Sequence, residues 1–428
     1  MWCCRLRRLL LLPARVTDKT SSRRTLAACA TLSCAYFAAI GGFNPYAPLW
    51  YKEMGLPVVA IGILVSLQSW TRLFAPYAWG ALADRTGRRV QIIRWTSLAS
   101  FVAGIGFLLP PAFANLAAAT FLMFVFNAAI VPMTETVIAA QLTTASGGMD
   151  ARRYGRVRMW GSIGFLASVV AMGWWYQAHG MKAFAGTTLA LLGVIVVCAW
   201  RVPLQPVVPH PAHEPSLPVG QVLRRPEVRW FFASVFLTVL AHSALYAFFS
   251  LYLDSLGYGK QVVGLLWAVS VVVEIIWFAF QGRLLERGTL HHWLIAAGLL
   301  AALRFALTAA FGGSLWLLIV VQCAHAITFA AQHTACIALV TRYFPGRLRG
   351  RGQALYSVLG YGFSGVLGGV GGAWLISWQG YPSAFWVASV AALAGAWCAW
   401  RSQQLDRSLT VAVEATPTNR RSSVSPPA

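Results

Sequence analysis

The sequence predicts an all-α integral membrane protein with twelve transmembrane helices in two pseudo-symmetric six-helix bundles. Two observations predict this fold. The 428-residue chain is 58% hydrophobic and only 11% charged, so it is far more apolar than a soluble domain of its length. The pattern of residues 49–85 also recurs without a gap at 251–287: a hydrophobic run, a Gly-containing turn, a second run, then Gly-x-Leu-x-acid-Arg. Such parallel repeats are typical of transporters whose binding site lies between the two repeats.

The hydrophobic runs give the positions of the helices. A helix needs about 20 mainly apolar residues to cross roughly 30 Å of hydrocarbon. Twelve such runs occur, six on each side of a polar segment that is rich in proline. We expect helices at 26–47, 58–79, 91–110, 115–140, 157–176, 183–200, 229–253, 261–281, 290–311, 314–340, 352–378 and 382–400.

The remaining segments complete the domain organisation. We assign residues 1–24 to a basic N-terminal tail, 25–200 to the first bundle and 229–401 to the second. The prolines of 201–228 favour an extended linker between the bundles. Residues 402–428 are polar and rich in Ser, Thr and Pro, which is typical of a disordered tail.

The basic residues predict the orientation. Arginines cluster in alternate loops and near both ends, and they produce the formal net charge of +22. The intervening loops hold only Lys52, Lys182 and Lys260. Basic loops mark the cytoplasmic side, and an even number of spans places both termini on one side. We therefore predict a multi-pass protein of a bacterial inner membrane, with 1–24, 201–228 and 402–428 in the cytoplasm. The charge then reflects topology, so no nucleic-acid partner is expected.

Metal and cofactor chemistry has no support in the pattern of residues. The eight cysteines and eight histidines are scattered, without Cys-x-x-Cys or His-Glu-x-x-His spacing. A nucleophile–base set and a phosphate-binding loop are also missing from the sequence. We therefore expect no metal, no cofactor and no enzyme activity.

The loop between the second and third runs reads Gly-Ala-Leu-Ala-Asp-Arg-Thr-Gly-Arg-Arg from Gly80. Its glycines permit a tight turn between helices, its aspartate can cap or pair with a helix end, and its arginines suit the headgroup region. The loop resembles the signature loop of the major facilitator superfamily, and a weaker version follows at 282–288. The resemblance implies a latch on the cytoplasmic gate, formed by Gly80, Asp84, Arg85, Gly87 and Arg88.

Ionisable residues inside the predicted spans are candidates for function, because each costs about 2.5–3.5 kcal/mol to insert. The repeat aligns Arg72 with Glu274, so opposite charges are expected at equivalent depths. We predict one central cavity between the bundles, lined by Arg72, Glu135, Arg158, Glu274, Arg304 and His325.

A more specific resemblance begins at residues 132–135 (Pro-Met-Thr-Glu) and 154–162 (Tyr-Gly-Arg-Val-Arg-Met-Trp-Gly-Ser). These stretches resemble the 3-phenylpropionate permease branch of the superfamily and, more distantly, lactose permease. The resemblance implies that Glu135 and Arg158 hold the substrate, with Phe165 where lactose permease stacks a Trp under its sugar. A structural ion pair between Glu135 and Arg158 is the alternative.

In the second half, Arg304 and His325 match the proton-coupling cluster of lactose permease. The resemblance places Glu274 in contact with substrate from the opposite half. Where lactose permease has a glutamate that carries the proton, this chain has Thr328, which cannot titrate. Burial favours the neutral form of a carboxyl, so Glu274 or Glu135 could carry the proton, and His325 could titrate near neutral pH. We expect Glu274 to be the leading carrier.

Two assignments around this cluster follow from helix geometry. Glu274 lacks a basic neighbour within one turn of its own helix, so we expect its partner across the cavity, with Arg72 as the candidate. His333 lies eight residues past His325, about 80° further round an α-helix, so the two need not share a face. A functional role and a helix-to-helix hydrogen bond both remain open for His333.

These residues favour a proton-coupled symporter that imports a small aromatic acid, such as a phenylpropionate-like compound, by alternating access. Intramembrane arginines offer partners for a carboxylate, and an apolar aromatic cavity suits a ring. A sugar or nucleoside symporter is the alternative, supported by Glu135, Arg158 and Phe165 but weakened by Thr328. A drug exporter is less favoured because 158–173 contains no proline. A membrane sensor that does not transport also stays open.

The expected partners are a small-molecule substrate, protons and the lipid bilayer, with a monomer as the functional form.

Overall fold

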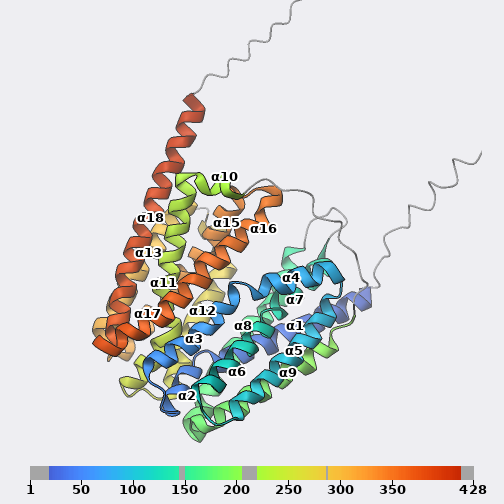
Figure 1. Ribbon diagram of the computed structural model, residues 1–428. Helices are drawn as coiled ribbons and strands as arrows, with labels where there is room; N and C mark the ends of the chain where they lie inside the picture. Colours follow the sequence, from blue (N-terminus) through green and yellow to red (C-terminus); the bar gives the residue numbers. More distant parts are fainter. Residues whose placement is uncertain (1–18, 144–149, 205–218, 286–287, 416–428) are drawn as a thin grey trace, which may run out of the picture. The chain divides into compact units, whose positions relative to one another are not determined.

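The computed structural model describes residues 19–143, 150–204, 219–285 and 288–415 (Figure 1). In these residues, twelve helices are long and apolar enough to cross a membrane. Each overlaps one predicted run, which confirms the predicted fold class. The spans are Ser22–Glu53, Val58–Thr86, Arg89–Leu108, Phe113–Leu142, Arg153–His179, Met181–Arg201, Pro226–Ser255, Lys260–Gln281, Leu290–Phe311, Leu315–Tyr343, Arg349–Gln379 and Tyr381–Arg407.

The chain forms two compact units. The first comprises Met1–Leu56, Phe74–Ala212 and Lys260–Leu265; the second comprises Pro57–Leu73, His213–Gly259 and Leu266–Ala428. Each unit therefore combines most of one sequence half with a short segment of the other.

The first unit contains the following helices, with 3₁₀ segments marked η: α1 (Lys19–Phe43), α2 (Ala47–Glu53), α4 (Ala75–Thr86), α5 (Arg89–Gly104), η2 (Ile105–Leu108), α6 (Phe113–Asn127), α7 (Ile130–Leu142), α8 (Ala151–His179), η3 (Met181–Ala183) and α9 (Phe184–Arg201). Helix α1 runs beside α8 (Figure 1), and glycines permit this close approach. A Cβ atom on Gly41 would lie 2.7 Å from the carbonyl oxygen of Phe165. One on Gly164 would overlap the backbone of Cys34.

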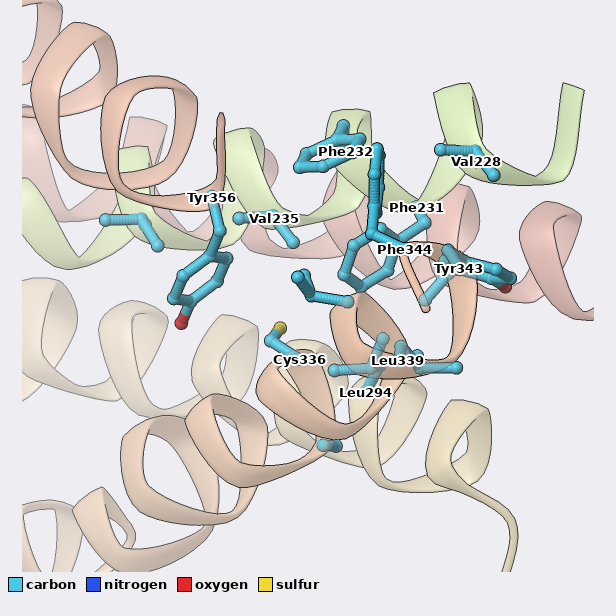
Figure 2. Close-up of a cluster of buried hydrophobic side chains, with 14 of the residues drawn as sticks. Val228, Phe231, Phe232, Val235, Leu294, Cys336, Leu339, Tyr343, Phe344 and Tyr356 are labelled. Atoms are coloured by element: carbon cyan, nitrogen blue, oxygen red, sulfur yellow. The ribbon is translucent and has the colours of Figure 1, made fainter. Parts of the chain in front are cut away.

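The second unit contains α3 (Val58–Arg72), α10 (Val219–Arg224), α11 (Pro226–Ser255), most of α12 (Lys260–Leu285), α13 (Leu290–Phe311), α14 (Leu315–Cys323), η4 (Ala326–Ala331), α15 (Gln332–Tyr343), η5 (Gly346–Leu348), α16 (Arg349–Leu355), η6 (Tyr356–Phe363), α17 (Ser364–Gln379) and α18 (Tyr381–Ala415). Helices α11 and α13 each pack extensively against α18. One apolar core joins α11 to α13, α15 and α18; Figure 2 shows the ring of Tyr356 at one end of this core.

Helix α17 packs closely on two sides through its glycines. A Cβ atom on Gly369 would lie 2.9 Å from Cβ of Ser66 in α3, and one on Gly372 would lie 2.6 Å from the ring of Phe248 in α11. Small residues on both faces therefore let α17 approach two neighbours at once.

Two segments of the second unit are π-helical, namely η4 and η6. Segment η4 continues directly into α15, and η6 joins α16 to α17 without a break. Each is therefore a widened turn inside a longer transmembrane helix. Such π-bulges are frequent at functional sites.

The boundary predicted at residue 402 needs correction, because α18 continues to Ala415. Ser402 is fully buried, and its hydroxyl donates to the backbone oxygen of Glu227 at 2.8 Å. Asp406 pairs with Arg342 at 2.9 Å. These contacts tie the start of the predicted tail to the second unit. The other predictions for 1–18, 205–218, 286–287 and 416–428 lie outside the described residues.

Candidate functional site

The most buried ionisable cluster of the second unit surrounds Arg304 of α13, whose side chain is 2% exposed. Its Nη1 donates to Nδ1 of His325 and to Oγ1 of Thr328, both at 3.0 Å. Its Nη2 donates to Oε1 of Gln322. Thr328 therefore serves as a neutral acceptor for the arginine.

These hydrogen bonds fix the protonation of His325. A guanidinium only donates, so Nδ1 of His325 must accept and cannot carry a proton. The neutral ring then has its proton on Nε2, which lies 3.8 Å from Oε2 of Glu274 on α12. This distance is too long for a direct hydrogen bond, so Arg304, His325 and Glu274 form a chain of contacts in which the Nε2 proton lies on the side of Glu274.

His325 is also the first ring of a stacked column. Its ring lies 5.0 Å from that of Phe329 at an interplanar angle of 6°, and Phe329 lies 6.1 Å from His333 at 16°. Helix α14 gives way to η4 directly after this position, and π-helical turns contain more residues than α-helical turns. The smaller advance per residue offsets the 80° expected for an α-helix, so the two histidines share a face. The α-helical geometry left this open, and the π-helix provides the common face.

The far end of the column meets two tyrosines of η6. Nδ1 of His333 lies 2.9 Å from the hydroxyl of Tyr356 and 3.3 Å from that of Tyr361. The two hydroxyls are 3.3 Å apart. His333 thus makes the helix-to-helix hydrogen bond that was one of its two expected roles. The guanidinium of Arg72 lies 5.9 Å over the ring of Tyr361.

Two residues of α11, His242 and Tyr246, lie beside the stacked rings of His325 and Phe329. His242 is 2% exposed; its Nδ1 lies 2.8 Å from the backbone oxygen of Thr238, while its buried Nε2 lacks a hydrogen-bond partner in the described structure. Tyr246, one turn later, is 38% exposed. Its ring lies 6.1 Å from that of Trp267 and 6.2 Å from that of Phe329.

The first unit holds a separate polar group. Arg158 of α8 pairs with Glu135 of α7 at 3.3 Å, and the hydroxyl of Tyr154 donates to the other Glu135 oxygen at 2.7 Å. The guanidinium also lies 4.7 Å over the ring of Phe37 of α1. Phe165 is half-buried two turns further along α8. The structure thus joins Glu135 and Arg158 in an ion pair, and Tyr154 donates to the same carboxylate.

The loop that begins at Gly80 turns through Gly87, whose φ of +67° is left-handed and favours glycine at this helix C-cap. Asp84 bonds Arg89 at 3.0 Å, at the start of α5. Gly80 lies inside α4 in open space, so the tight turn requires Gly87 alone. Arg85 and Arg88 are exposed beside it.

Sequence reasoning missed several members of the second-unit cluster, namely Tyr246, Gln322, Tyr356 and Tyr361. Uncharged side chains inside apolar runs are common, and most tyrosines of membrane proteins are expected at the interface. Spacing relative to His325 could have indicated Gln322, which lies three residues before it.

Comparison with known proteins decides the family. The model of the MFS_1 like family matches residues 31–387. The chain belongs to this family. It is 28% identical to the probable 3-phenylpropionic acid transporter of Escherichia coli K12, over 84% of this chain and 93% of that protein. It is 25% identical to the maltose permease of Geobacillus stearothermophilus, over 80% and 86% respectively.

Solved structures agree on the fold. The nucleoside transporter NupG superimposes with a TM-score of 0.76 at 16% identity, covering 90% of this chain and 99% of that one. The POT family transporter PepTSo gives a TM-score of 0.73 at 10% identity, covering 91% of this chain and 98% of that one. As a member of the MFS_1 like family, the protein is a multi-pass membrane transporter and not an enzyme.

Proposed function

We propose that this transporter is a proton symporter that imports a small aromatic carboxylic acid by alternating access. The observation that carries the proposal is the chain from Arg304 through His325 to Glu274. Because Arg304 donates to Nδ1, His325 stays neutral unless that bond breaks. Glu274 can gain or lose a proton with the bond intact, so it is the proton carrier.

The exchange of charge couples proton to substrate. Protonation neutralises Glu274 and lowers the negative charge near the arginines, which favours entry of a substrate carboxylate. Loss of that proton on the other side of the membrane repels the substrate and favours its release. Glu135, Arg158 and Phe165 of the first unit are proposed as further substrate-binding residues.

The substrate class is supported by the relative described as a probable 3-phenylpropionic acid transporter. It is also supported by the chemistry of the site, where guanidinium groups can bind a carboxylate and aromatic side chains can contact a ring. We further propose a monomer in a bacterial inner membrane with both termini in the cytoplasm.

Uptake into proteoliposomes tests the proposal. We expect labelled 3-phenylpropionate to accumulate when the outside is acidic, and a protonophore to abolish the accumulation. Equal uptake with and without a pH gradient would leave the protein a uniporter. No uptake or exchange of any aromatic acid would refute the substrate class.

A sugar substrate is the second candidate, because the chain is also 25% identical to a maltose permease. The first-unit group favours it: Glu135 accepts and Arg158 and Tyr154 donate, which suits hydroxyl groups. A thermal-shift comparison of maltose, a nucleoside and 3-phenylpropionate separates the candidates. A ligand at 100-fold its Kd stabilises the folded protein by about 2.7 kcal/mol.

A further inference from the structure

Three arginines inside the membrane spans, Arg304, Arg158 and Arg72, differ in which groups compensate their positive charge. Arg304 is buried, and its hydrogen bonds go to His325, Thr328 and Gln322. Arg158 is paired with Glu135 at 3.3 Å. For Arg72 the structure gives a face-on contact with a tyrosine ring, at 5.9 Å.

Arg72 is therefore the arginine that can bind an added anion. It is half-buried, and within the part of the chain that the structure describes it has no carboxylate at ion-pair distance. The ring of Tyr361 holds the guanidinium through its π face and leaves the N–H donors at its edge for other acceptors. A cation placed in a membrane span without a counter-charge is costly, and a bound carboxylate offsets that cost.

The side chain that can receive a ring is Tyr246. Its neighbours Leu245 and Ala247 are 2% and 8% exposed, whereas Tyr246 is 38% exposed. Its ring lies near those of Trp267, Phe329 and His242, and Phe329 also stacks on His325. The accessible face of Tyr246 is therefore part of the site.

Charge and aromatic surface belong to the same region of the second unit. The ring of Tyr246 lies 6.2 Å from that of Phe329, which stacks with His333. His333 in turn bonds to Tyr361, the tyrosine whose ring lies under Arg72. Trp267 is 7% exposed, and its Nε1 donates to Ser250 at 3.2 Å, which fixes its ring beside Tyr246. An aromatic wall and a guanidinium without a carboxylate at ion-pair distance among the described residues thus lie on one series of contacts within the second unit.

We propose that Arg72, Tyr246 and Trp267 form a binding subsite for an arylalkanoate. Arg72 binds the carboxylate, and the aryl ring packs on the accessible face of Tyr246 beside Trp267. This subsite deepens the proposed function and rests on it, because it assigns the carboxylate to Arg72 and not to Arg158 or Arg304.

Binding to the purified full-length protein tests the subsite without requiring transport. Titration calorimetry compares 3-phenylpropionate with 3-phenylpropan-1-ol, which has the same ring and no carboxylate. We expect the wild type to prefer the acid by about tenfold or more, since a site built for a charged partner rejects the analogue that lacks it. We expect Arg72→Gln to lose this preference and Arg229→Gln, at an exposed arginine outside the proposed binding residues, to keep it.

The ring contact is tested with Tyr246→Leu, which keeps side-chain bulk, and with Tyr246→Phe, which keeps the ring. Tyr246→Leu should weaken binding of both acid and alcohol several-fold, whereas Tyr246→Phe should bind both as the wild type does. Trp378→Leu is the matched control, because this tryptophan is 70% exposed on α17. Unchanged melting temperatures without ligand check that each variant is folded.

The outcomes separate the two proposals. If the wild type binds the acid, but Arg72→Gln keeps its preference or Tyr246→Leu binds normally, the subsite is wrong and the proposed function stands. If Arg158→Gln alone loses the preference, the carboxylate lies in the first unit. If the wild type binds neither compound, the aromatic-acid function fails, and the subsite with it.

Discussion

At the scale of single residues, the protonation states follow from which groups can only donate. Arg304 donates to Nδ1 of His325 at 3.0 Å, so that nitrogen is occupied as an acceptor. A second proton on His325 would meet the guanidinium head-on. In the proposed mechanism, His325 therefore orients the cluster and Glu274 carries the proton.

Replacing Glu274 with Gln removes the titrating group while it keeps the shape of the side chain. We expect uptake driven by a pH gradient to be abolished, while counterflow exchange of substrate continues, because exchange needs no net proton movement. Both are measured in proteoliposomes with the same labelled acid. Glu53→Gln, on exposed Glu53 at the end of α2, is the control and should behave as the wild type. Normal accumulation by Glu274→Gln would transfer the proton to Glu135 or His325, or remove it from the mechanism.

Arg304 should be irreplaceable by the other basic side chains, because three acceptors depend on its planar fork. Lysine carries a point charge and cannot reach all three. We expect Arg304→Lys to lower stability by about 1–3 kcal/mol, the cost of buried acceptors left without donors. Thermal unfolding in detergent measures this, with exposed Arg229→Lys as the control. An unchanged melting temperature would mean that water or a rearranged Gln322 replaces the lost bonds.

At the scale of elements, the sequence predicted the helices well and their internal irregularities poorly. Runs of apolar residues report span length, and all twelve overlap the observed helices. The π-helix of η4 has no such signal, because its widened turn is set by packing around His325, Phe329 and His333. The sequence therefore identified both histidines but not their common face, and the tyrosines that bond to His333 were missed for the same reason.

Close packing of α3 on α17 gives an element-scale prediction. A Cβ atom on Gly62 would meet the backbone oxygen of Gly369 at 2.5 Å, and the backbone cannot easily move away. We expect Gly62→Ala to destabilise the protein by about 1–3 kcal/mol, as overpacking does. Gly186→Ala is the matched control: Gly186 lies in α9 with open space around its Cα, so the change should be neutral or slightly stabilising. Thermal unfolding compares the two. Equal melting temperatures would mean that α3 and α17 separate readily at this point.

At the scale of the whole molecule, the repeat predicts which helices are equivalent, and the distribution of charge predicts the orientation in the membrane. The repeat predicted two equivalent sets of helices, yet the compact units exchange 57–73 and 260–265 between the sequence halves. This exchange places Arg72 in the unit that also holds Glu274, Arg304 and Tyr361. Periodicity in a sequence records which segments are equivalent, whereas side-chain packing decides which of them join.

Orientation in the membrane is the prediction that depends on charge alone. Arginine-rich loops should face the cytoplasm, so Lys52 and Lys182 should lie on the outer side and Arg88 and Arg153 on the inner side. Single cysteines at these four positions, in a variant whose native cysteines are replaced by serine or alanine, can be labelled in intact cells with a membrane-impermeant thiol reagent. We expect Lys52→Cys and Lys182→Cys to react directly, and Arg88→Cys and Arg153→Cys to react only after the membrane is permeabilised. Labelling of Lys52→Cys and Arg88→Cys from the same side would contradict a helix between them that crosses the membrane once. It would overturn the twelve-span topology on which the direction of proton and substrate movement depends.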